Sequence, residues 1–471
     1  MIEKQKIFDS LPPEWPQDLM PFIQQKVSEQ GVKIVVLDDD PTGTQTVRDV
    51  TVLTRWDVQN LTSVLKEPDA IVYILTNSRS YPLPKAQDIN REIALNLKQA
   101  SLQTGRAFTV VSRSDSTLRG HFPGEVEALI GALEVEVDGI LIIPFFAEGG
   151  RFTIGDVHYV ADGDWLTPAS ETEYAKDASF GYHHSDLRKW VSEKYQGRVS
   201  AEEVVSIGLE MLRKGGPAMV TELLMKLAHE RICVVNAASY RDMEVFVAGL
   251  LQAEANGKRF IYRTAASFVR VRGGMRSYPV LTSQELGVKK NETGGLIIAG
   301  SYIRRSSEQI AQVAALENVV SVEISAPKLL KPSMRQGEIE EAVRKVSESL
   351  RQGKEALVYT SRELITGKDE AESLGIGRKI SSALVEIPQR LEVRPAWVIA
   401  KGGITSSDVA TLGMNVSRAR VLGQILPGVP VWRTGEDSRW PGITYVVFPG
   451  NVGGADAIAQ AVEKLRAVGR G

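Results

Sequence analysis

Short runs of β-branched and aliphatic residues alternate with longer amphipathic segments along nearly the whole chain. The amphipathic segments, for example 306–318 and 338–353, repeat apolar residues every three or four positions, as helices with one buried face do. Apolar runs of strand length separated by such helices are typical of parallel sheets covered on both faces. The sequence therefore predicts an α/β fold in which mostly parallel sheets are flanked by helices. The expected strands span 33–38, 70–76, 107–114, 139–146, 231–237, 259–264, 295–301, 319–325, 355–361, 396–403 and 444–451.

The domain organisation follows from length and from one interruption of the pattern. A chain of 471 residues is longer than one hydrophobic core usually supports. Polar residues and glycine break the alternation at 281–294, which we interpret as a linker. We expect a helical N-terminal extension over 1–30 and two α/β domains over 31–280 and 295–471. Two such lobes would leave a cleft between them, and ligands of open parallel sheets bind beyond the carboxyl ends of the strands.

Composition excludes several classes of partner. The 56 basic and 58 acidic residues leave a formal net charge of −2, which gives no electrostatic footprint for nucleic acid or an anionic membrane. Residues 1–17 are charged and broken by proline, unlike a signal peptide, and no apolar run approaches the roughly 18 residues that a membrane helix needs. We therefore expect a cytoplasmic protein. The single cysteine, Cys233, lies in a strand-like run and is interpreted as a buried core residue.

Carboxylates, arginines and hydroxyls gather at four predicted strand ends of the first lobe. The first strand ends in Asp38, Asp39 and Asp40, and further clusters follow at 112–120, 148–153 and 171–177. Arginine binds a carboxylate in a bidentate fork, while aspartate accepts hydrogen bonds from sugar hydroxyls and can take a proton from one of them. Aspartate and threonine also cap helices at such positions. Four clusters at successive strand ends nevertheless favour a site for a small polyhydroxylated acid.

The strand ends of the second lobe are rich in glycine instead. They read Ala-Gly-Ser at 299–301, Lys-Gly-Gly-Ile-Thr-Ser at 401–406 and Pro-Gly-Asn-Val-Gly-Gly at 449–454. Glycine lets phosphate oxygens approach backbone N–H groups closely. Neither the P-loop motif nor the dinucleotide motif G-x-G-x-x-G occurs. An acid-rich lobe combined with a glycine-rich lobe suggests phosphoryl transfer from a nucleotide to a small hydroxy acid.

Several segments in order along the chain resemble the four-carbon acid sugar kinase family. Members of that family phosphorylate acid sugars such as threonate, erythronate and 3-oxo-tetronates with ATP. The family motif A-D-D-x-T-G resembles the segment at 39–43, and I-D-S-T-L-R-G resembles 114–120. Weaker matches lie at 150–158 and 172–177, and in the second half the matching segments are 402–406, 420–430 and 449–454.

The resemblance implies a sugar-acid site in the first lobe and a site for ATP, with Mg²⁺ as cofactor, in the second. The only partners that the resemblance implies are small molecules. It does not indicate which residues bind the metal, and a homo-oligomer is possible. The residues that would position or deprotonate the acceptor hydroxyl are Asp39, Asp40 and Asp115. The expected substrate-binding residues are Thr42, Gly43, Ser116, Thr117, Arg119, Gly150, Arg151, His158 and Glu173. The expected nucleotide-binding residues are Gly300, Ser301, Gly402, Gly403, Thr405, Ser406, Gly450, Asn451 and Gly453.

Two alternative functions remain at this point. The run ending in Asp38 and Asp40 also resembles the opening motif of haloacid-dehalogenase-like phosphatases, in which Asp38 would be the nucleophile and Asp40 the acid or base beside Mg²⁺. No later strand ends in the paired acids that would complete that metal site. The other alternative is a sugar-acid sensor without catalysis, because Ile404 stands where the kinase family has an acidic residue.

Overall fold

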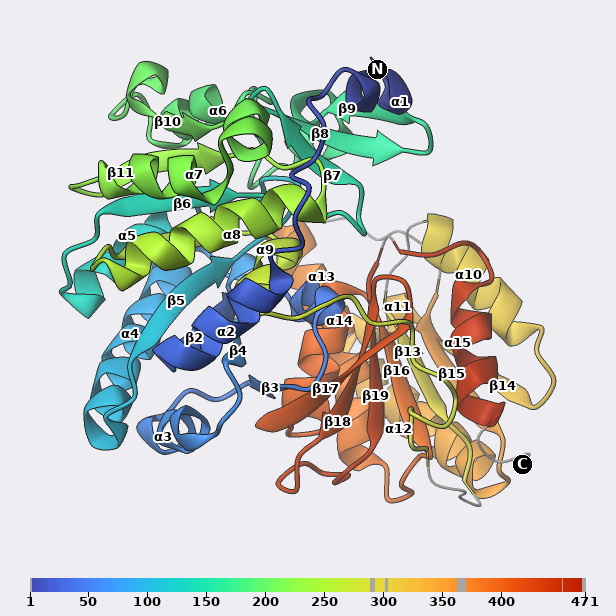
Figure 1. The fold of residues 1–471 in the computed structure, drawn as a ribbon. Helices are drawn as coiled ribbons and strands as arrows, with labels where there is room; N and C mark the ends of the chain where they lie inside the picture. The colour runs from blue at the N-terminus through green and yellow to red at the C-terminus, as the bar shows by residue number, and fades with distance from the viewer. Residues whose placement is uncertain (1, 289–292, 301–303, 362–369, 451, 468–471) are drawn as a thin grey trace. The chain divides into compact units, whose positions relative to one another are not determined.

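The computed structural model describes residues 2–288, 293–300, 304–361, 370–450 and 452–467. The chain divides into two compact units (Figure 1). Unit 1 comprises Met1–Val47 and Arg55–Ser277, and unit 2 comprises Arg48–Thr54 and Tyr278–Gly471. Each unit contains a sheet flanked by helices, so the predicted α/β fold with mostly parallel sheets is confirmed.

The main sheet of unit 1 is parallel throughout. Every neighbouring pair in it runs in the same direction, with Asp38 opposite Arg113 and Arg113 opposite Thr264. This register brings the carboxyl ends of its central strands to one level. The strand order is β10 (Val205–Ile207), β11 (Arg231–Val235), β6 (Gly139–Ile143), β12 (Phe260–Thr264), β5 (Phe108–Arg113), β2 (Lys33–Asp38) and β4 (Ile71–Leu75).

The helices of unit 1 gather in two groups, as expected for a sheet covered on both faces (Figure 1). One group holds α3 (Val58–Lys66), α4 (Leu83–Thr104) and α5 (Gly124–Leu133), and the other holds α2 (Met20–Gln30), α7 (Gly216–Met225), α8 (Tyr240–Ala255) and α9 (Ala266–Arg272). In α4 the buried residues Ala86, Ile93 and Leu97 recur at helical spacing, so one stripe of the helix is covered. The carboxylate of Asp186 caps the N-terminus of helix α6 (Leu187–Lys194).

A small antiparallel sheet in unit 1 was not predicted. Its order is β1 (Ile2–Glu3), β9 (Trp165–Pro168), β8 (Val157–Asp162) and β7 (Arg151–Ile154). The strands are short and alternate buried with partly exposed residues, so they lack the continuous apolar runs that marked the parallel strands. The expected N-terminal extension contains α1 (Lys4–Asp9) and α2, and its β1 pairs with β9 as part of unit 1.

The sheet of unit 2 combines a parallel and an antiparallel half. Its order is β3 (Val50–Leu53), β17 (Arg418–Leu426), β18 (Val429–Thr434), β19 (Thr444–Phe448), β16 (Trp397–Lys401), β13 (Leu296–Ala299), β15 (Glu355–Thr360) and β14 (Val319–Ile324). The strands from β3 to β19 pair antiparallel, and those from β19 to β14 pair parallel. Strand β3 comes from the early segment 48–54, a long-range pairing that no local pattern indicates.

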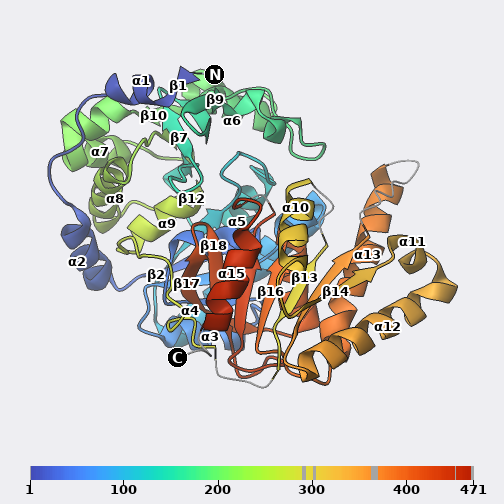
Figure 2. The ribbon, with the colours of Figure 1, turned by 90° about the vertical axis from the view of Figure 1, so that its right-hand side faces the viewer.

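The helices of unit 2 also form two groups. Helix α10 (Arg304–Ala314) packs beside α15 (Ala457–Arg466), as Figure 2 shows. The other group holds α11 (Ala326–Leu329), α12 (Pro332–Arg351), α13 (Glu370–Arg390) and α14 (Gly403–Asp408). The segment expected to be a linker instead contributes Leu281 and Leu286 to the hydrophobic core of this unit, where both are almost fully buried.

The single cysteine lies in the core of unit 1. Cys233 lies in β11 with no exposed surface, so the prediction of a buried core cysteine is confirmed. Across the described ranges, no helix has the length and hydropathy to cross a bilayer.

Candidate functional site

Charged side chains cluster at the carboxyl ends of three neighbouring strands of unit 1. Because β4, β2 and β5 are adjacent and parallel, the residues that follow them meet at one edge of the sheet. We call this group the acid–arginine cluster. Its members are Asp38, Asp39, Asp40, Arg79, Arg113, Asp115 and Arg119.

Asp38 lies at the bottom of the acid–arginine cluster. Its side chain is 2% exposed, and Arg113 donates from Nη1 to its Oδ1 at 3.1 Å. The carboxylate also occupies the space where a Cβ on Gly43 would lie, with Oδ2 2.1 Å from that position. Burial raises the pKa of Asp38 to about 7, a shift that Arg113 opposes. The buried carboxylate of Asp38 therefore packs against Gly43, in the turn that follows β2.

Arg79 connects three carboxylates of the cluster. It follows Asn77, which adopts a left-handed conformation with φ of 50° that asparagine tolerates better than most residues. The guanidinium of Arg79 lies 2.5 Å from Asp40, 3.4 Å from Asp115 and 3.9 Å from Asp39. Like charges this close would repel one another, and Arg79 offsets that repulsion.

The turn that follows β2 fixes Asp40. The backbone N–H and the Oγ1 of Thr42 donate to Oδ1 of Asp40 at 2.8 Å and 2.5 Å. Burial by itself would raise the pKa of Asp40, but the charge of Arg79 and the bonds from Thr42 outweigh it, so the pKa is lowered. Asp40 is thus an ionised carboxylate whose orientation is set by its own turn.

Asp39 has spare acceptor capacity. The hydroxyl of Ser114 donates to its Oδ2 at 2.8 Å. Its Oδ1 is buried and accepts no hydrogen bond from the described residues, while Nη1 of Arg113 lies 3.8 Å away. A carboxylate oxygen with unused lone pairs beside an arginine can accept a hydrogen bond from a ligand hydroxyl and take its proton.

Asp115 opens the loop that follows β5. Thr117 and Nε of Arg119 both donate to its Oδ2, the arginine at 2.8 Å. Burial would raise the pKa of Asp115, but Arg119 and Arg79 together hold it well below the usual range. Asp115 is therefore a fixed negative charge at the edge of the cluster.

Side chains from other elements hold the carbonyl groups of this loop. Tyr182 donates to the carbonyl of Thr117 at 2.8 Å, and Arg263 donates to the carbonyls of Asp115 and Arg119 at 3.3 Å and 2.9 Å. Within the loop Leu118 has a φ of 70°, a conformation that costs a non-glycine residue energy. The neighbouring elements thus hold the loop in a shape that its own sequence does not favour.

His158 supports the same loop from behind. It is fully buried, and its Nε2 lies 2.7 Å from the carbonyl of Ser116 while its Nδ1 lies 2.9 Å from the hydroxyl of Thr153. Burial lowers the pKa of His158 to about 4, so the neutral ring donates from Nε2 and accepts at Nδ1. We expected His158 to bind substrate, but the structure gives it the position of a support for Ser116.

Two predicted arginines meet on one aromatic ring. The guanidinium carbons of Arg119 and Arg151 lie 5.1 Å and 5.6 Å from the ring centroid of Tyr174. Gly150, with φ of 71°, forms the turn from which Arg151 extends. Glu173 is exposed on the neighbouring turn, and no described hydrogen bond or ion pair joins it to the acid–arginine cluster. The two arginines form a cationic pair suited to a carboxylate.

Three residues of this region were assigned no individual role from the sequence. Arg79 and Arg113 form the ion pairs described above, and Glu125 lies nearby at the start of α5. Asn90 donates to Glu125 at 3.1 Å. Burial, and then the charge of Asp39, raise the pKa of Glu125 to about 7. As for metal binding, the parts of the chain that the structure describes contain no group of three His, Cys, Asp or Glu side chains arranged to hold an ion.

In unit 2 the register of the sheet aligns three glycine-rich turns. Ala299 pairs with Lys401 and Lys401 pairs with Phe448, so Gly300, Gly402 and the turn at 449–450 follow adjacent strands at one level. A Cβ on Gly300 would lie 2.9 Å from Oγ1 of Thr405. Gly402 has a φ of 106°, which only glycine adopts readily. The predicted residues Gly300, Gly402 and Thr405 are therefore together.

The other predicted residues of unit 2 have different positions. Ser406 is fully buried and donates to the carbonyl of Ala400 at 2.6 Å, so it supports the turn from inside. Gly403 begins α14, Gly450 follows β19, and a Cβ on Gly453 would lie 2.4 Å from Cβ of Ala457. Ile404, in place of the family's acidic residue, is 56% exposed. Ser301 and Asn451 lie outside the described residues.

Lys401 was not assigned a role from the sequence. It ends β16 with no exposed surface, and its Nζ donates to the carbonyls of Pro449 and Gly450 at 2.6 Å and 2.9 Å. Its ammonium also lies 4.8 Å from the ring centroid of Phe448. Burial lowers the pKa of Lys401 to about 7, with the charge of Arg305 adding to the shift.

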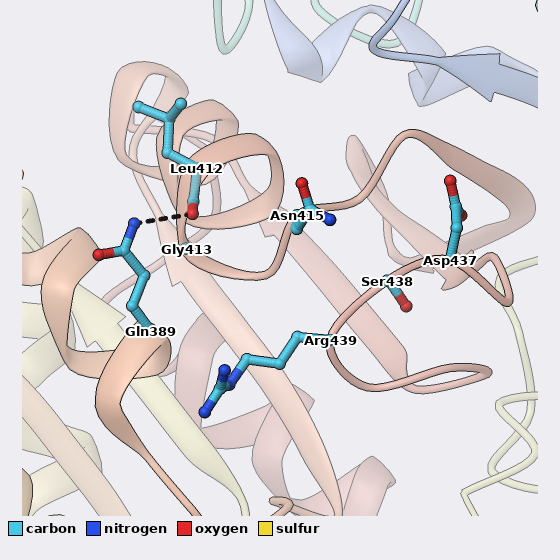
Figure 3. A pocket seen from close by; sticks show the side chains of 7 residues that line it. All are labelled: Gln389, Leu412, Gly413, Asn415, Asp437, Ser438 and Arg439. Atoms are coloured by element: carbon cyan, nitrogen blue, oxygen red, sulfur yellow. Dashed lines mark hydrogen bonds between the residues drawn. The ribbon is translucent and has the colours of Figure 1, made fainter.

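A separate pocket of about 290 Å³ lies at the opposite edge of the sheet of unit 2 (Figure 3). Gln389, near the end of α13, donates to the carbonyl of Leu412 at 2.9 Å at its rim. The loop holding Asp437 and Arg439 precedes β19, whereas the glycine-rich turns follow it. This pocket is therefore distinct from the glycine-rich turns.

Comparison with protein families matches both halves of the chain. A model described as "Sugar-binding N-terminal domain" matches residues 34–272, and one described as "Nucleotide-binding C-terminal domain" matches 296–458. A D-erythronate kinase of Heliobacterium modesticaldum is 28% identical over 141 residues, which are 29% of this chain and 29% of the relative. The match with that curated relative therefore spans about three tenths of its length.

Two solved structures share the fold. One, described as a putative tRNA synthase from Salmonella typhimurium LT2, has a TM-score of 0.65 at 16% identity, covering 91% of this chain and 98% of the other. The second, a Haemophilus influenzae protein of a family of unknown function, has a TM-score of 0.61 at 19% identity, covering 92% and 100%. At such identities the likeness concerns the fold.

Proposed function

We propose a sugar-acid kinase activity for this chain, which belongs to the family with a sugar-binding N-terminal domain and a nucleotide-binding C-terminal domain that includes the four-carbon acid sugar kinases. The relationship to a D-erythronate kinase supports a kinase acting on acid sugars. The specific proposal is transfer of the terminal phosphoryl group of ATP to a hydroxyl of a tetronate such as erythronate, threonate or a 3-oxo-tetronate.

The acid–arginine cluster carries the proposal for the acceptor. Arg119 and Arg151, held on Tyr174, would bind the carboxylate of the acid in bidentate fashion. The carboxylates of the cluster would accept hydrogen bonds from the hydroxyls. A phosphatase of the alternative class would use Asp38 as its nucleophile, but this carboxylate accepts a hydrogen bond from Arg113 and packs against Gly43, so the arrangement favours the kinase.

Asp39 is the residue we propose as the base. Its Oδ1 accepts no hydrogen bond from the described residues, whereas Asp40 and Asp115 are engaged by Thr42 and Arg119. In the reaction the hydroxyl proton would move to this oxygen as the hydroxyl oxygen bonds to phosphorus and the nucleoside diphosphate leaves. The charged groups around that oxygen would stay in place during the reaction, because Arg79 forms ion pairs with both Asp40 and Asp115.

The glycine-rich turns of unit 2 carry the proposal for the donor. Gly300 and Gly402 follow adjacent strands, where backbone N–H groups can approach phosphate oxygens. Mg²⁺ stays a prediction of the family resemblance, because the described residues offer no set of ligands for a resident ion and an exposed isoleucine occupies position 404. No step proposed here depends on such an ion.

The experiment is a panel of tetronates with ATP, in which ADP formation is followed with the full-length chain. We expect turnover with at least one four-carbon acid, and a loss of about 100-fold or more in Asp39→Asn if Asp39 is the base. The matched control is Asp138→Asn, which removes an acid paired with Lys258 at 2.8 Å at the amino end of β6, opposite the carboxyl ends of the strands, and should retain turnover. Absence of ADP formation with every tetronate, at confirmed folding, would refute the proposal. Binding of the acids without binding of ATP would favour the sensor.

A further inference from the structure

Lys401 is a buried cation without an acidic partner. No described carboxylate forms an ion pair with it, and its two hydrogen bonds go to backbone carbonyls of the turn at 449–450. Fully buried lysines are rare unless they are paired, because removing an ammonium from water costs several kcal/mol. A charge of the same sign, that of Arg305 on α10, acts on Lys401. In the absence of a ligand, the folded protein therefore disfavours the charged form of Lys401.

The two carbonyl contacts determine which groups the turn presents. In a trans peptide unit the C=O and the following N–H point in opposite directions. Because the carbonyl of Pro449 points to Lys401, the N–H of Gly450 points away from the ammonium group. An N–H with an ammonium behind it is an anion-binding arrangement.

Polar groups beside the same turn also lack partners. Gln309 on α10 donates to the carbonyls of Val452 and Gly454 at 3.1 Å and 2.9 Å, which ties α10 to the segment after β19. Its Oε1 and the Oγ of Ser306, one turn earlier on α10, are buried without a hydrogen-bond partner in the described residues. A serine hydroxyl can donate to a phosphate oxygen.

We propose that Lys401 is the positioning residue of the nucleotide site, which orients the Pro449–Gly450 turn and supplies the positive charge that a bound polyphosphate neutralises. The inference rests on the proposed function of unit 2 as the nucleotide-binding unit. It explains why a cation is buried without an acid: the ligand is the missing counter-charge. It also gives the glycine-rich turns a charged group, although the turn at 402–406 carries none of its own.

A protonation signature follows from the geometry. A phosphate group next to Lys401 favours its charged form, so nucleotide binding restores the proton that the free protein loses above a pKa of about 7. The affinity of the wild-type chain for ATP should therefore fall between pH 7.5 and 9, approaching about tenfold per pH unit. Of the described titratable groups, Arg305 is the one whose charge acts on Lys401.

The test uses calorimetric titration of the full-length chain with ATP at several pH values, and with a sugar acid as a second ligand. Lys401→Met should raise the dissociation constant for ATP at pH 7 by about 10- to 100-fold, remove its pH dependence and leave sugar-acid binding unchanged. In the wild type, titrations at pH 8 in buffers of different ionisation enthalpy should show uptake of about one proton per ATP.

The matched control is Lys33→Met. Lys33 is 1% exposed at the start of β2 in unit 1, and its Nζ donates to the carbonyls of Glu67 and Asp69 at 3.3 Å and 2.5 Å. It shares the burial and the carbonyl contacts of Lys401 but lies away from the glycine-rich turns. Lys33→Met should leave both the affinity for ATP and its pH dependence unchanged.

The outcomes separate this inference from the proposed function. If the wild-type chain binds no ATP, the proposed function fails and the inference with it. If the wild type binds ATP, and Lys401→Met binds it equally well with the same pH dependence, only the inference fails. Should Lys401→Met not fold, the wild-type titrations decide: uptake of a proton at pH 8 supports the inference, and its absence overturns it.

Discussion

At the strand ends of unit 1, carboxylates stand among arginines, whereas at those of unit 2 the buried charge is a lysine held by carbonyl groups. Arg79 lies within 4 Å of Asp39, Asp40 and Asp115, so the charges of unit 1 largely balance one another before any ligand arrives. Lys401 has no such partner among the described residues. We call the strand ends of unit 1 the closed edge, because their charges are paired with one another. We call those of unit 2 the open edge, because Lys401 has no acidic partner among the described residues.

The difference indicates what each edge can bind. A closed cluster favours a ligand that exchanges hydrogen bonds with it, such as a polyhydroxylated acid with one carboxylate. An open cation favours a ligand with several negative charges, because the ligand relieves a cost that the free protein bears. Variants that remove one charge from each edge test whether the two edges differ in this way.

The largest effect is expected for Arg79→Met. Removal of the arginine leaves buried carboxylates next to one another, and breaking such a pair from one side costs about 3–5 kcal/mol. Chemical denaturation should show a large loss of stability in unit 1, accompanied by loss of kinase turnover. Lys401→Met, by contrast, leaves no other charge unpaired and removes only two hydrogen bonds to carbonyl groups, so without ligand it should be far less destabilising than Arg79→Met.

The control for Arg79→Met is Arg276→Met. Arg276 pairs with Asp18 at 2.9 Å on the surface of unit 1, and 53% of its side chain is exposed. Exposed pairs contribute little to stability, so this variant should unfold like the wild type. The comparison between the two edges would be wrong if Arg79→Met were as stable as Arg276→Met, or if Lys401→Met were as unstable as Arg79→Met.

A smaller effect is expected at the bottom of the closed cluster. A Cβ on Gly43 would lie 2.1 Å from Oδ2 of Asp38, so Gly43→Ala must displace that carboxylate from Arg113. Overpacking of this kind typically costs about 1–3 kcal/mol. Asp38→Ala vacates the space but leaves the buried Arg113 without its partner, so adding Gly43→Ala to Asp38→Ala should cost little further stability. Additive losses in the two substitutions, measured by denaturation, would show that the carboxylate does not limit this position.

Most of the parallel architecture could be predicted from the sequence, because buried parallel strands are read as continuous apolar runs. The runs at 33–38 and 319–325, for example, correspond to β2 and β14. The antiparallel strands β7 to β9 and β17 were missed, because half of each faces outward and interrupts the run. The pairing of β3 with β17 joins residues some 370 positions apart, which a local pattern does not encode.

The candidate site was predicted less completely. The sequence indicates that Asp38, Asp39 and Asp40 end a strand, but not which cations face them. Arg79 lies four residues beyond the end of β4, after the left-handed Asn77, a backbone conformation that a single sequence does not reveal. Lys401 was read as part of a glycine-rich segment, since nothing local shows that its ammonium points inward. In both cases the contacts are with residues that follow neighbouring strands, and those contacts are known only once the strands are paired in the sheet.

The last and smallest effect concerns pH, and it should have opposite signs at the two edges. The pKa of Asp38 is raised in the folded state to about 7, so between the unfolded value near 3.8 and pH 7 the folded chain binds more protons than the unfolded chain. Its contribution to stability therefore falls as the pH rises, by about 1.4 kcal/mol between pH 6 and 8. The pKa of Lys401 is lowered to about 7, so above pH 7 the unfolded chain binds more protons, and stability rises with pH toward 10.5.

Replacing Asp38 or Lys401 shows which part of the dependence of stability on pH each residue causes. In denaturation midpoints measured from pH 6 to 10, Asp38→Asn should flatten the fall below pH 8 without changing the behaviour above it. Lys401→Met should flatten the rise above pH 7 and leave the lower range unchanged. Glu125→Gln serves as a check on the first, because burial raises the pKa of Glu125 to about 7 as well and its removal should act in the same direction as that of Asp38. If Asp38→Asn and Lys401→Met altered the profile in the same direction, the contrast between a closed and an open edge would be lost.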